Sequence, residues 1–123
     1  MGKILLPLLF FFQPVLVNAQ SRTVDSLQRL LAQEREDTSR VPLLNQLSAA
    51  YLYTRPDTAL ALSQQALLLS RKNAFKKGEA ESLGRIGNSF MVTSNYEKAL
   101  KMHLASLQLA EKTNDLTRVQ GML

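Results

Sequence analysis

The chain has 123 residues, a formal net charge of +5, no cysteine and a single histidine. One domain is the expected limit at this length. The absence of thiols excludes disulfides, a cysteine nucleophile and cysteine-ligated zinc, and one imidazole cannot build a histidine-rich metal site. No glycine-rich phosphate loop or nucleophile elbow is present either. We therefore expect a protein that is not an enzyme, with no catalytic residues, no cofactor and no metal.

The segment over residues 1–19 is strongly apolar, carries a single basic residue at Lys3, and contains two prolines. Small side chains in Val17-Asn18-Ala19 precede Gln20, which is the pattern that signal peptidases cleave. The segment predicts a signal peptide over residues 1–19, cleaved between Ala19 and Gln20. The expected mature protein is periplasmic or secreted and has no membrane span. A retained anchor or a buried first helix is the alternative.

Leucine and alanine dominate the rest of the chain, and β-branched residues are few. Apolar side chains such as Leu44, Leu47 and Tyr51 recur at i, i+3 and i+7, which places them on one face of a helix. The fold class expected from this pattern is all-α. The predicted helices cover residues 24–36, 39–53, 56–73, 77–93 and 95–113, and a further helix begins at 116.

The chain also repeats itself. Leu44 and Leu47 return later in the chain as Leu83 and Ile86, and Ala59-Leu60 returns at nearly the same offset as Ala99-Leu100. Two helices in each period of this length are typical of an α-solenoid. The expected organisation is a lead-in helix over 20–38 and a repeat region over 39–123. Its units cover about 39–74 and 75–114, with a partial third unit over 115–123.

The order of residue types within the second unit is large apolar, small, aromatic, turn and small. These residues are Leu83, Ile86, Gly87, Phe90, the string Asn95-Tyr96-Glu97-Lys98-Ala99, and Ser106. The pattern resembles the tetratricopeptide repeat family over about residues 40–123. The whole layout, signal peptide first, resembles the N-terminal extracytoplasmic region of bacterial sensor histidine kinases. The resemblance implies a protein-interaction module, expected as a sensory or scaffold fragment of a larger signalling protein.

Family members that bind peptides do so through a concave face lined by the first helix of each unit. The residues here that match this face and are expected to contact a peptide or protein partner are Asn45, Arg85, Asn88 and Met91. Arg85 and Asn88 lie one turn apart, a spacing suited to holding a carboxylate or a peptide backbone. Ordinary solvated helix residues would give the same pattern.

Three further features leave alternatives open. His103 stands where the family more often has a bulky aromatic, so it is either a ligand or pH sensor or a filler of the helix interface. The basic residues Arg71-Lys72 and Lys76-Lys77 suggest an anionic surface or nucleic acid, although a solvated turn is the expectation and no nucleic acid is expected. The partial third unit leaves the second unit uncovered, which predicts self-association through this end. A truncated remnant with only a structural role remains an alternative function.

Overall fold

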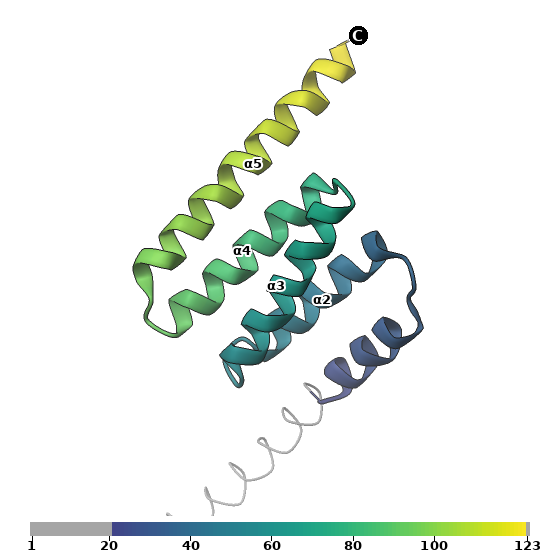
Figure 1. Ribbon diagram of the computed structural model, residues 1–123, viewed down its shortest axis with the longest axis vertical. Coiled ribbons are helices and arrows are strands. Elements are labelled where there is room, and N and C mark those ends of the chain that lie inside the picture. The colour runs from purple at the N-terminus through teal and green to yellow at the C-terminus, as the bar shows by residue number, and fades with distance from the viewer. Residues whose placement is uncertain (1–20, 123) are drawn as a thin grey trace, which may run out of the picture.

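The computed structural model describes residues 21–122, and the side chains as far as Asn114. Within this range the chain consists of helices joined by short turns (Figure 1). Residues 21–33 are helical, and the later helices are α2 (Asp37–Tyr51), α3 (Pro56–Lys72), α4 (Lys76–Val92) and α5 (Tyr96–Met122). The all-α prediction is confirmed for the described residues.

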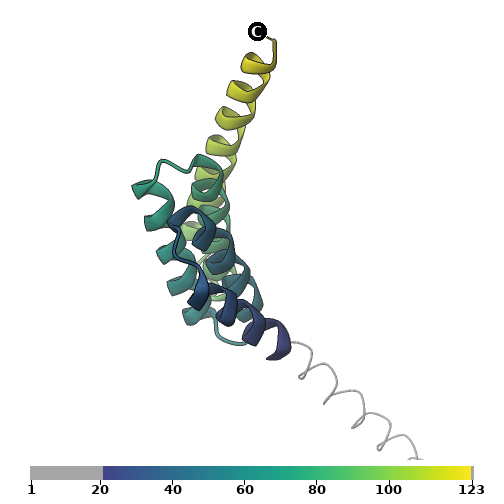
Figure 2. The same ribbon diagram turned by 90° about the vertical axis from the view of Figure 1, so that its right-hand side faces the viewer.

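Each of these helices packs against the next one along the chain. α2 contacts α3, α3 contacts α4, and α4 contacts α5, while α2 also reaches α4 (Figure 1). α3 therefore lies against both α2 and α4. In Figure 2 the C-terminal part of α5 extends beyond the other helices.

Small side chains make the close packing around α3 possible. Ala59, Ser63, Ala66 and Ser70 follow one face of this helix at intervals of three or four residues, and none of them is exposed to solvent. The serine hydroxyls donate to carbonyls one turn earlier, over 3.0 Å from Ser63 to Ala59 and 2.8 Å from Ser70 to Ala66. The buried hydroxyls are thus satisfied within their own helix, and neighbouring helices can approach without leaving a polar group unpaired.

The turns after α3 and α4 have the same construction. Ala74 (φ 50°) and Ser94 (φ 64°) both adopt the left-handed conformation. In each turn the next backbone N–H donates over 2.8 Å to a carbonyl of the preceding helix, from Phe75 to Ser70 and from Asn95 to Phe90. This pattern is the Schellman motif, which ends a helix by satisfying its last carbonyls.

The predicted break near residue 114 is wrong. α5 continues as one helix of 27 residues to Met122, without the turn that the prediction placed between residues 113 and 116. The preceding turn shows what is missing. There Phe75 packs against the core cluster, and Gly78 leaves room for its ring. At the equivalent positions one repeat later the sequence has Asp115 and Arg118 in place of this phenylalanine and glycine.

The N-terminal boundaries also differ from prediction. The first helix ends at residue 33, and α2 begins at Asp37, so Pro42 lies in the interior of α2 and not in its first turn. Arg40 explains the tight connection, because its Nη1 donates to the carbonyls of Leu31 (2.9 Å) and Glu34 (3.0 Å). The predicted signal peptide and its cleavage site at Ala19 and Gln20 lie outside the described residues.

Candidate interaction site

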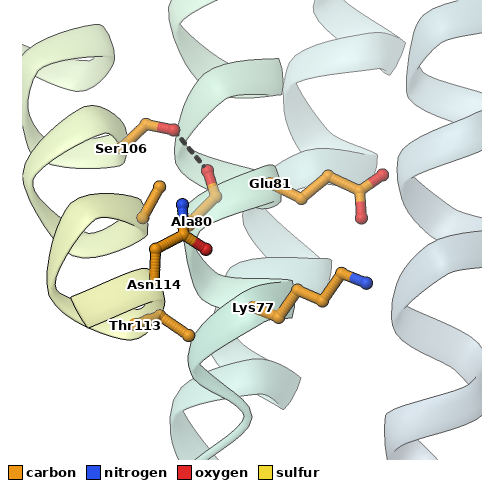
Figure 3. Close-up of a pocket in the computed structure, with 7 residues that line it drawn as sticks. Lys77, Ala80, Glu81, Ser106, Thr113 and Asn114 are labelled. Carbon is orange, nitrogen blue, oxygen red and sulfur yellow. Dashed lines mark hydrogen bonds between the residues drawn. The ribbon is translucent and has the colours of Figure 1, made fainter. Parts of the chain in front are cut away.

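A hollow lies between α4 and the middle of α5. It has a volume of about 530 Å³ (Figure 3), and it continues into a shallower hollow of about 230 Å³ that shares Ala80, Glu81 and Ser106 with it. We call the two together the α4–α5 cleft. The α4 side is formed by Lys77, Ala80, Glu81, Gly84, Arg85 and Asn88. The α5 side is formed by His103, Ser106, Ala110, Thr113 and Asn114.

Small residues hold the two sides of the cleft together at its base. The Ser106 hydroxyl on α5 donates to the Ala80 carbonyl on α4 over 2.6 Å, the hydrogen bond drawn in Figure 3. A Cβ added to Gly84 would meet the Ser106 oxygen at 3.4 Å, which is ordinary contact. The space above Gly84 is therefore open.

His103 packs directly against the backbone of α4. A Cβ on Gly87 would lie only 2.8 to 2.9 Å from three atoms of the His103 ring, so a larger residue at this position would force the ring or the helices to move. The corresponding pair one repeat earlier is Ser48 and Ser63, and the larger histidine is thus matched by a smaller residue across the interface. The Nε2 atom of His103 is buried and has no hydrogen-bond partner among the described residues. This geometry supports the role of interface filler.

The charged side chains of the cleft lie along α4. Lys77, Glu81 and Arg85 follow one another one helical turn apart, and in Figure 3 Lys77 and Glu81 extend away from α5. The Arg85 Nη2 atom is 3.9 Å from the Glu81 carboxylate, and both side chains are partly exposed. Within the part of the chain that the structure describes, the Arg85 guanidinium forms no hydrogen bond. Its N–H groups remain available to an incoming carboxylate or carbonyl.

The four residues that were predicted to contact a partner do not all lie in the cleft. Arg85 and Asn88 line the shallower part of the cleft together with His103. Met91 is 48% exposed but is not among the lining residues. The prediction for Asn45 is wrong, because this residue is fully buried and its Nδ2 donates to Ser82 on α4 over 3.0 Å. α4 covers the part of α2 that was expected to face a partner.

The α5 side of the cleft was missed by the sequence analysis. The repeat pattern assigned partner contacts to the first helix of each unit only, so Ser106, Ala110 and Asn114 were not considered. A signal was nevertheless present. Ser106 is one of the small residues of the repeat pattern, and small residues mark positions where helices approach closely.

The basic residues between α3 and α4 do not form a free positive patch. Arg71 and Lys76 both contact Glu79, at 3.2 Å and 3.5 Å. Lys72 lies 3.7 Å from Asp37. Three of the four basic side chains thus face carboxylates, which reduces their attraction for an anionic surface or nucleic acid.

Other kinds of site have no support among the described residues. Residues 21–122 include no group of three or more histidine or acidic side chains placed to hold a metal ion. In the same range no helix has the length and apolar character needed to cross a membrane. Comparison with known proteins found no matching family model, no matching curated protein and no matching solved structure.

Proposed function

We propose that this protein is an exported helical-repeat module of the tetratricopeptide type that binds a peptide or protein partner in the α4–α5 cleft. The repeat interpretation is supported by the packing order of the helices and by the matching turns at Ala74 and Ser94. It is also supported by the small residues at the interfaces, Ser63 and Ala66 among them. Stacked helix pairs of this kind present an elongated surface to partners.

The observation that carries the binding function is the open cleft with Arg85 and Asn88 on one side. A guanidinium with free donors and a neighbouring amide can hold a carboxylate or a peptide backbone together. The base of the cleft is uncharged and built from small residues such as Ala80 and Ser106, which allows a partner to approach the helices closely. Specific side chains of the partner would then meet the charges on α4.

Three wider elements belong to the same proposal. Export rests on the apolar segment over residues 1–19, and the sensory or scaffold role rests on the resemblance of the layout. Self-association is supported by an exposed apolar stripe on α5, in which Leu100 is 60%, Leu104 48% and Leu107 54% exposed. These leucines are spaced to lie on one helix face, and the stripe is available to another chain.

The binding function is tested by selecting ligands from a displayed random-peptide library against the purified chain. Selected peptides should lose at least about tenfold in affinity with Arg85→Ala and with Asn88→Ala, since lost hydrogen bonds to charged groups have effects of this size. Lys101→Ala is the matched control. It removes a positive charge from an exposed residue of α5 that pairs with Glu97 and does not line the cleft.

Fluorescence polarisation with each labelled peptide gives the affinities. Equal binding by the wild type, Arg85→Ala and Asn88→Ala would remove the cleft as the binding site. Failure to select any peptide would contradict the proposed function itself.

A further inference from the structure

The cleft corresponds position by position to a region that is filled elsewhere in the same molecule. Ala80 and Gly84 on α4 are the equivalents, one repeat later, of Val41 and Asn45 on α2. Both of these earlier residues are completely buried. In the same way, Ser106 and Ala110 on α5 are the equivalents of Ala66 and Ser70 on α3, which are both 0% exposed. The α4–α5 cleft is thus the open equivalent of a surface that is covered on α2 and α3.

The element that covers the earlier surface is α4 itself. Ser82 of α4 accepts the hydrogen bond from Asn45 on α2. Gly78 of α4 lies over α3, where an added Cβ would be 2.9 Å from the Ser70 hydroxyl oxygen. α4 therefore uses small residues one helical turn apart, Gly78 and Ser82, to enter the groove between its two neighbours. Residues at this spacing lie on one face of a helix.

We propose that the α4–α5 cleft receives an amphipathic α-helix from a separate polypeptide, packed as α4 packs on α2 and α3. This inference rests on the proposed function and specifies its partner. Lys77 and Asn88 mark the ends of the cleft on α4, and their separation in a helix is about 17 Å. That length accommodates roughly three helical turns. The partner helix presents Gly, Ala or Ser at position i toward Ala110, the equivalent of Ser70, and at position i+4 toward Gly84, the equivalent of Asn45.

Charge specifies one more position of this helix. In the filled interface, Glu79, which directly follows Gly78, pairs with Arg71 on α3 over 3.2 Å. The residue of α5 that corresponds to Arg71 one repeat later is Glu111, and its side chain is exposed. α5 therefore offers a negative charge at the position where α3 offers a positive one. The partner helix carries Lys or Arg at position i+1, directly after its first small residue.

The experiment uses peptides copied from α4, because this helix already fits the equivalent groove. The probe is a fluorescein-labelled, terminally blocked peptide of residues 75–93 that carries Glu79→Lys. The expected result is saturable binding to the full chain, about threefold tighter than that of the unchanged 75–93 peptide, the size of effect typical of an exposed ion pair. Glu111→Lys in the protein should reverse this preference.

Two matched controls test the geometry. A probe that also carries Gly78→Leu and Ser82→Leu should lose at least about tenfold in affinity, because bulky side chains cannot enter the groove. In the protein, Gly84→Leu and Ala110→Leu each place a side chain in the open space and should weaken binding to the same extent. Circular dichroism verifies that each variant is folded, and two variants are used so that one remains if the other fails to fold.

The outcomes separate the partner proposal from the proposed function. Absence of probe binding while library-selected peptides still bind through Arg85 and Asn88 would overturn the helix proposal and leave the interaction function intact. Absence of both would overturn both. Probe binding that Gly84→Leu and Ala110→Leu leave unchanged would place the peptide elsewhere, for example on the Leu100–Leu107 stripe. A dimer of the wild type that both variants dissociate would place a second copy in the cleft, contrary to the proposal of a separate partner.

Discussion

Replacing Gly87 and Gly84 by alanine should have opposite effects on stability, although both glycines lie within α4. In a helix interior, alanine is more favourable than glycine by about 1 kcal/mol. The new Cβ at Gly84 would meet only the Ser106 oxygen at 3.4 Å. Gly84→Ala should therefore raise the free energy of unfolding by about 0.5–1 kcal/mol.

At Gly87 the same gain is opposed by a collision. The added Cβ would lie 2.8 to 2.9 Å from three atoms of the His103 ring, closer than real contacts allow. Relief requires the ring or the two helices to move, and overpacking of this kind costs about 1–3 kcal/mol. The net expectation for Gly87→Ala is a loss of about 1 kcal/mol, so the two variants should differ by roughly 2 kcal/mol.

Urea denaturation followed by circular dichroism measures both effects, and the absence of tryptophan makes this signal preferable to intrinsic fluorescence. A double-mutant cycle with His103→Ala isolates the cause. Once the ring is absent, Gly87→Ala should change from destabilising to stabilising by about 1 kcal/mol. If Gly87→Ala destabilises the protein equally with and without His103, the close contact between α4 and α5 is not its cause, and the packing described for this interface is incorrect.

Three further predictions concern a turn, a buried hydrogen bond and the N-terminus. Ala74→Gly should stabilise the protein by about 1 kcal/mol, because Ala74 has a φ of 50° and a left-handed residue other than glycine carries a cost of this size. Thermal unfolding should show a rise in Tm. An unchanged or lower Tm would argue against the left-handed turn. Ser82→Ala should destabilise the protein by about 1–3 kcal/mol, because it leaves the fully buried Asn45 amide without its partner. Urea denaturation measures this loss of stability, which should fall to about zero when Asn45→Leu is also present. Expression in a bacterial host should give a periplasmic product that begins at Gln20; mass spectrometry of the exported protein that shows an intact Met1 would contradict the signal-peptide prediction.

Helix positions were predictable from sequence because apolar residues and turn signals coincide. The predicted helices over 56–73 and 77–93 differ by only one residue at each affected end from α3 and α4, where Pro56 and the Asn73–Phe75 turn mark the boundaries. The continuity of α5 was not predictable from similarity alone. The sequence repeat aligns residues 115–120 with the segment that begins at Phe75, where the chain turns, whereas the chain stays helical as far as Met122.

The candidate site was predictable in part for a related reason. Arg85 and Asn88 were predicted because the resemblance to the repeat family places partner contacts on the first helix of each unit, and both residues line the cleft. Asn45 on α2 was predicted on the same ground, but burial depends on the neighbouring helix, and α4 covers this residue. The pattern of one helix cannot reveal this. His103 and Gly87 illustrate the same principle, since each residue type is explained only by the other across the interface.

The α4–α5 cleft is an open copy of a surface that α4 covers on α2 and α3, and thiol labelling tests this relation most directly. The chain has no cysteine, so Ser106→Cys and Ala66→Cys each provide a single probe at equivalent positions. Ser106→Cys should react with a maleimide within about tenfold of the rate of a free thiol. Ala66→Cys, at a position of 0% exposure, should react at least about 100-fold more slowly, because labelling there requires the helices to open. Equal rates at the two positions would contradict the account, whether both are protected or both are fast.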